Sequence, residues 1–311
     1  MLTCDAYLTP TSLEEALRLW AEASAKGGRL VAGATDTLPW ARQGRAGDIA
    51  GDRHVPAIVD ISRVAGLNDY GVQGGRVRLG ANVVLQRFLE DDTLKRHLPC
   101  MPYCAVWFAD DQIRQQATLA GNIVNASPAA DATPPMLALD GAVELAKAGA
   151  GGIARRSLPL SGFVLGPGKT ALDPGEIVTA IECDSAQGYG GAFEKVGQRR
   201  SLVISTVCIA ACVKPSADGR RFDDVRLAMA GIGPVPLRLS DVEAFLRGKP
   251  VSPDVIAAAA ELPTDRIRSR TRQDYRKAVV RGFVERALLD ALSDAGVAVA
   301  EPRAREELAH A

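Results

Sequence analysis

Two turns of small residues interrupt the apolar runs of this chain and constrain its fold more than any other feature. Residues 33–37 (GATDT) follow the apolar strand 30–32, and residues 120–122 (AGN) lie within the run 117–131 (ATLAGNIVNASPAAD). Small side chains leave the backbone bare, so its N–H groups can approach an anion closely. Either turn alone is typical of a tight bend. Together they fit a doubly charged pyrophosphate better than a single phosphate.

The composition is that of an ordinary globular protein, with 47% hydrophobic and 24% charged residues. The 37 basic and 37 acidic residues give a formal net charge of zero, so no basic face is predicted for nucleic acid or an anionic membrane. The longest apolar run, residues 207–213, is too short to span a bilayer. The N-terminus lacks the charge pattern of a secretory signal, and a cytoplasmic location is expected.

Four of the six cysteines are predicted to be buried free thiols rather than metal ligands. No pair has CxxC spacing, and the three histidines lie far from them in sequence. Cys100 and Cys104, like Cys208 and Cys212, are four apart in apolar runs, which is one face of a helix or one side of a strand. We therefore expect no iron–sulfur cluster and no zinc in this chain, and a reducing compartment.

The local pattern changes near residue 176. Residues 149–175 are rich in Gly and Pro, and strands are predicted after them, followed by helices that end with a long one over about 271–294. Strands first and helices after are typical of an α+β domain. The expected domains are residues 1–176, in two parts of about 1–56 and 57–176, then a C-terminal domain over 177–295 and a tail over 296–311.

Helix starts are predicted at polar side chains that precede helical patterns. Ser12 and Glu15 form an S-x-x-E capping box. Asn82 is predicted to cap a helix that reaches residue 89, and Ser240 and Ser252 to cap two later helices.

The run GPGKT at residues 166–170 is not a P-loop. The motif needs a glycine where Phe163 stands, and residues 172–175 are typical of a turn where a P-loop requires a helix. No G-x-G-x-x-G follows a strand with an acidic residue about 20 positions later, so a Rossmann site is unsupported. No Ser-His-Asp arrangement indicates a hydrolase.

Six segments, in order, match a known family. They are AGATD at 32–36, ATLAGNIVNASPAAD at 117–131, GEIVTAIE at 175–182, FEKVGQRR at 193–200, RLAMAGIGPVPLRL at 226–239 and TRQDYRKAVVRGFVERAL at 271–288. The chain resembles the FAD-binding (medium) subunit of molybdenum hydroxylases, the xanthine dehydrogenase and carbon monoxide dehydrogenase medium-chain family. That family usually has glycine where Ala34 and Ala120 stand, and alanine keeps its N–H but resists positive φ.

The resemblance implies an α+β fold: a two-part FAD-binding domain of the vanillyl-alcohol-oxidase-like (PCMH) type, followed by an α+β C-terminal domain. It also implies an oxidoreductase component, the electron-transfer subunit of a molybdopterin-dependent hydroxylase or dehydrogenase. Electrons would pass from [2Fe–2S] clusters of a partner subunit through FAD to an acceptor such as NAD, oxygen or quinone. The implied partners are a large molybdopterin-binding subunit and a small [2Fe–2S] subunit, in a dimer of heterotrimers.

The resemblance assigns roles to four residues outside the turns. Phe108 would pack against the flavin ring, whereas its neighbour Trp107 is interpreted as core. Asp131 would contact the flavin chain, and the backbone of Val178 would lie at the flavin. The Lys195 cation would stabilise the anionic reduced flavin.

Backbone N–H groups around residues 33–37 and 118–122 would hold the pyrophosphate. No catalytic residue and no metal ligand is implied in this chain. The implied cofactor-binding residues are Ala32, Gly33, Ala34, Thr35, Asp36, Thr37, Phe108, Thr118, Leu119, Ala120, Gly121, Asn122, Asp131, Val178 and Lys195.

Two other functions stay open at this point. One is a stand-alone flavin oxidase of the same fold, although the stretch after residue 176 is short for the substrate-capping domain of such enzymes. The other is a non-catalytic FAD-binding scaffold, which the alanines at positions 34 and 120 suggest. The organic substrate is not legible, because its pocket would belong to a different subunit.

Overall fold

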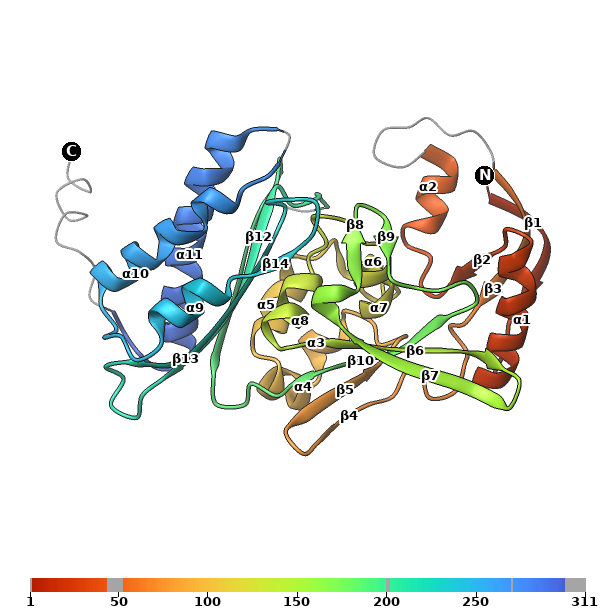
Figure 1. Cartoon of the computed structure of the whole chain (residues 1–311), viewed down its shortest axis with the longest axis horizontal. Coiled ribbons are helices and arrows are strands. Elements are labelled where there is room, and N and C mark those ends of the chain that lie inside the picture. The colour runs from red at the N-terminus through yellow and green to blue at the C-terminus, as the bar shows by residue number, and fades with distance from the viewer. Residues whose placement is uncertain (1, 44–52, 200–201, 270, 300–311) are drawn as a thin grey trace. The chain divides into compact units, whose positions relative to one another are not determined.

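The computed structural model describes residues 2–43, 53–199, 202–269 and 271–299, and the chain divides into two compact units (Figure 1). Of the expected tail over 296–311, residues 300–311 lie outside the described part. Each unit is assembled from three separate stretches of chain. Unit 1 comprises Met1–Arg87, Ala109–Ala126 and Asp140–Asp184, and unit 2 comprises Phe88–Phe108, Ser127–Leu139 and Ser185–Ala311.

Unit 1 begins with a parallel sheet on which a helix packs. The strand order is β1-β3-β2, with bounds Leu2–Leu8 for β1, Arg53–Asp60 for β3 and Arg29–Val31 for β2. Helix α1 (Leu13–Ala25) packs on β3. The cap at Ser12 is confirmed, because its Oγ accepts from Glu15 N at 3.2 Å. The Glu15 carboxylate reaches back as a capping box requires, but it accepts from Thr11 N at 3.1 Å, one residue before the cap.

A second sheet of unit 1 is antiparallel throughout, in the order β4-β5-β10-β6-β7. The bounds are Tyr70–Gln73 (β4), Arg76–Gly80 (β5), Ala142–Gly149 (β6), Gly152–Pro159 (β7) and Ile177–Asp184 (β10). The boundary expected near residue 176 lies at the start of β10. This strand pairs with β5 and β6 at the centre of the sheet and is buried along most of its length.

The GPGKT run forms a hairpin. It joins β8 (Val164–Gly166) to β9 (Lys169–Thr170), and Gly168 takes a positive φ of 67° at the turn. The strand-to-helix form of a P-loop is therefore absent at these residues.

Unit 2 is a four-stranded antiparallel sheet between two groups of helices (Figure 1). Helices α9–α11 lie on one side, and α5 and α8 lie on the other. The strands, in order across the sheet, are β11 (Gly190–Val196), β12 (Val207–Pro215), β13 (Phe222–Ala230) and β14 (Leu237–Arg238). The helices are α5 (Cys100–Trp107), α8 (Thr133–Ala138), α9 (Ser240–Leu246), α10 (Pro253–Glu261) and α11 (Gln273–Asp294). The short helices α3 (Arg87–Glu90) and α4 (Asp92–His97) precede α5.

Alternation along β12 explains how both faces are filled. Residues 207, 209, 211 and 213 belong to the core that α9–α11 cover, so the even positions point to the other face. Cys100, Cys104, Cys208 and Cys212 are all buried, as predicted, and no disulfide joins the described cysteines. Cys4 is only partly buried.

Two neighbouring glycines let chain segments approach both faces of β11. A Cβ at Gly190 would lie 2.0 Å from the carbonyl oxygen of Ala291 in α11. A Cβ at Gly191 would lie 2.2 Å from the carbonyl carbon of Pro99, just before α5. Close packing leaves no room for either side chain, so larger residues would push both helices off the sheet.

Two of the predicted helix caps are wrong. Asn82 is buried and its Nδ2 donates to Ile61 O at 2.6 Å, while the next helix, α3, begins only at residue 87. Ser240 is the first residue of α9, whose cap position, Leu239, supplies no side-chain bond. The cap at Ser252 is confirmed, since its Oγ accepts from Val255 N. Short polar side chains can bond many backbone groups, and tertiary packing decides which.

Within the described residues, no helix is long and apolar enough to cross a membrane.

We expect Glu194 to make stability fall as pH rises. Its side chain is 12% exposed and lies 2.8 Å from Arg286. Burial raises its pKa to about 7, assisted by Asp290 and opposed by Arg286. Between about pH 4.5 and pH 7 the folded chain therefore keeps a proton that the unfolded chain has released. The stability from this proton is full below that window and is lost as pH rises through it.

The measurement is the free energy of unfolding from urea titrations between about pH 5 and pH 8. Glu194→Gln removes the titrating group and should flatten the decline, whereas Glu22→Gln, at an exposed pair with Arg18, is the control for the substitution itself. Equal slopes in the wild type and Glu194→Gln would contradict the assignment.

Candidate functional site

The first small-residue turn joins β2 to α2 (Thr37–Gln43) in unit 1. Ala34 takes a left-handed conformation with φ of 53°, and its carbonyl accepts from Leu38 N at 3.1 Å. In the described part of the chain, the N–H groups of Gly33, Ala34 and Thr35 donate to no protein acceptor. A left-handed residue can turn successive N–H groups toward one point, which is how backbone nests bind anions.

The second small-residue turn is the first turn of the short helix α7 (Leu119–Val124). Thr118 caps it, because its Oγ1 accepts from Gly121 N at 3.0 Å. The N–H of Leu119 donates to the carbonyl of Val83, and that of Asn122 donates to the carbonyl of Thr118. The N–H of Ala120, a residue only 4% exposed, has no acceptor among the described residues. A buried backbone donor without a partner is costly, so this N–H is available to a ligand.

The two turns lie against each other, backbone on backbone. A Cβ at Gly33 would lie 1.8 Å from the carbonyl oxygen of Gln116, three residues before the first residue of α7. A second link comes from Asn125, whose amide donates to the Asp36 carboxylate. Only glycine at position 33 permits the first contact, and the hydrogen bond joins the first turn to the C-terminal end of α7.

Val178 lies on β10 in the same unit, where the ladder with β6 is irregular. Its register shifts between Val178 and Ala180. The carbonyl of the intervening Thr179 accepts from Ala81 N at 3.0 Å instead. Helix α7 contacts β10, so three of the expected groups share one unit: the two turns and Val178.

Unit 2 holds the expected residues Asp131 and Lys195 as a buried ion pair. The Lys195 Nζ donates to Asp131 Oδ2 at 2.5 Å, and the side chains are 4% and 9% exposed. Asp131 Oδ1 accepts from Ser205 Oγ at 2.5 Å, and Lys195 also donates to Trp107 O at 3.3 Å. A surface lysine is the ordinary expectation for a strand residue, and burial with a counter-ion is the less common arrangement.

Burial is the largest influence on the titration of this cluster. It raises the pKa of Asp131, while Lys195 and the hydroxyl of Ser205 pull that pKa back down. It also raises the pKa of Cys104 and Cys208 well above the ordinary thiol value, and the nearby Asp131 charge raises both further. The two thiols therefore stay neutral beside the ion pair.

Phe108 ends helix α5 and is partly buried. The apolar surroundings of its neighbour Trp107 predict a core residue, and this prediction is wrong: Trp107 is 38% exposed. A short apolar run cannot tell which face of a helix is covered, because that depends on packing against distant strands.

Three contributors to these sites lie outside the sequence-based set. Gln116 supplies only a carbonyl, so its side chain carries no signal. Asn125 lies inside the run 117–131, which contains the second turn. Its polar side chain among small residues is the signal from which a contact with the first turn could have been predicted. Ser205 stands ten positions after Lys195, just after the short apolar run 202–204, with nothing in the sequence to link it to Asp131. Among the described residues, no cluster of three or more His, Cys, Asp or Glu side chains is placed to hold a metal ion.

Protein-family models match both parts of the chain. The model described as "FAD binding domain in molybdopterin dehydrogenase" matches residues 3–183, more than half of the sequence. The chain belongs to this family. A second model, described as "CO dehydrogenase flavoprotein C-terminal domain", matches residues 192–291.

Individual relatives agree over nearly the full length. The putative xanthine dehydrogenase FAD-binding subunit of Escherichia coli K12 is 28% identical over 304 residues, covering 95% of this chain and 99% of the relative. The carbon monoxide dehydrogenase medium chain of Hydrogenophaga pseudoflava is 29% identical over 289 residues, covering 91% and 95%. A solved structure of carbon monoxide dehydrogenase from H. pseudoflava superposes with a TM-score of 0.82 at 27% identity, over 93% of this chain and 97% of that one.

These findings confirm the resemblance and the predicted fold, an α+β chain with an FAD-binding domain followed by a C-terminal domain. The chain is an FAD-binding medium subunit of the molybdenum hydroxylase type and thus a component of an oxidoreductase.

The alanines at the two usual glycine positions should respond oppositely to the same substitution. Ala34 is left-handed, which costs an L-residue about 1 kcal/mol, so Ala34→Gly should stabilise the chain by about that amount. Ala120 is helical, so Ala120→Gly should destabilise it by about 0.5–1 kcal/mol. Thermal unfolding of the FAD-free chain measures both changes. Shifts of the same sign would contradict the backbone conformations assigned to the turns.

Gly33→Ala should separate the two turns and lose most bound FAD, because its Cβ would overlap the Gln116 carbonyl. The measurement is FAD per chain after purification, by absorbance, with far-UV circular dichroism to confirm folding. Gly71→Ala is the matched control, since a Cβ there meets no atom within 4 Å. A folded Gly33→Ala chain with full FAD would show that the turn contact does not support binding.

Proposed function

We propose that this chain holds FAD through its pyrophosphate on the turns at 32–37 and 118–122 and acts as the electron-transfer subunit of a molybdopterin-dependent hydroxylase or dehydrogenase. The single observation that carries the proposal is the backbone contact of Gly33 with Gln116, which brings two turns with unused N–H groups together. Bare N–H groups from two turns suit a ligand with two linked phosphates. The residues therefore fit FAD.

Backbone dipoles, rather than charged side chains, would bind the pyrophosphate. The N–H groups of Gly33, Ala34 and Thr35 offer donors from the first turn, and that of Ala120 offers one from the second. Asp36 is the acidic side chain in the first turn, and the Asn125 amide holds its carboxylate. That bond keeps the negative charge engaged within the protein and leaves the N–H groups to the ligand.

The remaining family-implied contacts come from Phe108, Asp131, Val178 and Lys195. Phe108 would offer an aromatic face to the flavin ring, and Val178 its backbone at the irregular part of β10. Lys195 would present a positive charge to the ring, and Asp131 would contact the flavin chain. When bound, FAD supplies the redox step, taking electrons from [2Fe–2S] clusters of a partner subunit and passing them to an acceptor such as NAD, oxygen or quinone.

The chain is proposed to work in the cytoplasm with a large molybdopterin-binding subunit and a small [2Fe–2S] subunit, in a dimer of heterotrimers. Support comes from the relatives, whose names describe an FAD-binding subunit and a medium chain of larger enzymes. Those names refer to xanthine and to carbon monoxide, two unlike substrates. A subunit type shared by both supports the view that another subunit selects the substrate.

The purified chain alone tests the proposal. Acid precipitation should release FAD, identified by mass, at one per chain. The bound FAD should be reduced by dithionite and reoxidised by an acceptor, while candidate heterocycles and aldehydes leave it unchanged. Purification from the native host should bring two further chains. Turnover of an organic substrate by the chain alone would favour the stand-alone oxidase, and FAD that dithionite cannot reduce would favour the scaffold.

A further inference from the structure

Both oxygens of the Asp131 carboxylate are engaged, each by a different segment of unit 2. Oδ1 accepts from Ser205 Oγ at 2.5 Å, and Oδ2 accepts from Lys195 Nζ at 2.5 Å. Ser205 is 5% exposed, so water does not compete freely for the carboxylate. Two donors on opposite oxygens fix the rotation of a carboxyl group, which one donor alone leaves free.

The lysine is fixed in turn. Its ammonium group has three N–H donors, of which one goes to Asp131 and one to the Trp107 carbonyl at 3.3 Å. Among the described residues, no third acceptor faces Nζ. A buried cation with one unused donor is held ready for a group outside the protein.

We propose that Ser205 is a positioning residue for Lys195: by binding Oδ1 of Asp131, it turns the carboxylate so that Oδ2 holds the ammonium group with one N–H directed to the flavin. This inference rests on the proposed function, in which Lys195 faces bound FAD. Ser205 itself has no contact with the ligand in this account. Its hydroxyl acts through two successive hydrogen bonds, from Ser205 to Asp131 and from Lys195 to Asp131.

The electrostatics of the cluster agree with this arrangement. The groups facing Asp131 are Lys195 from β11, Ser205, Cys208 from β12 and Cys104 from α5, whose Sγ donates to the Asp131 carbonyl at 3.3 Å. The thiols stay neutral, so Lys195 supplies the positive charge, and hydrogen bonds from Lys195, Ser205 and Cys208 add to the stabilisation of the buried carboxylate. Loss of the Ser205 hydroxyl would raise the pKa of Asp131 and weaken the counter-ion of Lys195.

The test is the midpoint potential of bound FAD in a double-mutant cycle. Lys195→Met should lower the potential, because the cation that stabilises reduced FAD is removed. Ser205→Ala should lower it by a smaller amount, and the double variant should match Lys195→Met alone, since Ser205 has no effect without the lysine. Equal potentials in Ser205→Ala and the wild type, or additive effects in the double variant, would overturn the proposal.

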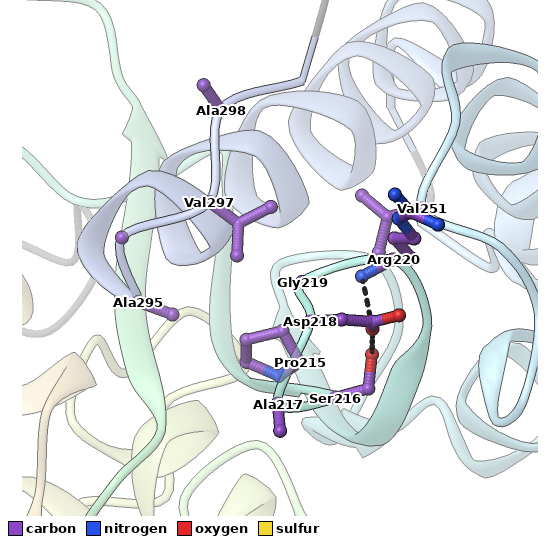
Figure 2. Close-up of a pocket in the computed structure, with 11 residues that line it drawn as sticks. Pro215, Ser216, Ala217, Asp218, Gly219, Arg220, Val251, Ala295, Val297 and Ala298 are labelled. Atoms are coloured by element: carbon purple, nitrogen blue, oxygen red, sulfur yellow. Dashed lines mark hydrogen bonds between the residues drawn. The ribbon is translucent and has the colours of Figure 1, made fainter.

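An exposed turn of unit 2 supplies a matched control. There Ser216 Oγ donates to Asp218 Oδ1 at 2.6 Å, and Figure 2 shows the pair beside a cavity of about 620 Å³ between the β12–β13 turn and the end of α11. Ser216→Ala removes the same kind of hydrogen bond without a buried lysine, and should leave the potential at its wild-type value.

A pair of equal-sized substitutions decides the matter if Ser205→Ala fails to fold. Ser205→Thr keeps the hydroxyl and should keep the wild-type potential. Ser205→Val has the same shape as threonine but no hydroxyl, so it should lower the potential. Equal potentials in these two variants would overturn the proposal. A chain that binds no FAD at all would instead refute the proposed function, so the two failures are distinguishable.

Discussion

The contact of the Gly33 backbone with the Gln116 carbonyl is the constraint on which the first unit depends. Two turns from distant parts of the chain can meet this closely only where one of them has no side chain. The Asp36–Asn125 hydrogen bond then holds the same pair of turns at a second point. Both turns keep unused N–H groups. The parallel sheet that ends at the first turn and the short helix α7 that begins at the second therefore hold these backbone donors in fixed positions.

In the second unit, the main constraint is a buried cation, the Lys195 ammonium group. Lys195 is held by Asp131 and by a backbone carbonyl, and Asp131 is held by Ser205. Burial disfavours each charge alone, and the pairing offsets much of that cost. On the strand that carries Lys195, Gly190 and Gly191 let α11 and the start of α5 pack closely on the two faces of β11.

The sequence predicted correctly those features that depend on neighbouring residues. The caps at Ser12 and Ser252 and the long helix α11 all depend on residues within a few positions of each other. The predictions for Asn82 and Trp107 are wrong because the positions of these side chains depend on segments far away in sequence, whereas the cap predicted at Ser240 is displaced by one residue, to Leu239. The same holds for the site: small residues located both turns, but the Gly33–Gln116 contact and the Ser205–Asp131 bond join positions 83 and 74 residues apart. No periodicity in one sequence encodes such pairs.

The most direct test of the central claim is the set of backbone amide resonances of the ¹⁵N-labelled chain during titration with FAD and, separately, with riboflavin, which lacks phosphate. If the two turns bind the pyrophosphate, FAD should shift the amide signals of Gly33, Ala34, Thr35 and Ala120, and riboflavin should leave them in place. Stoichiometric FAD binding with those four signals unmoved would contradict the account.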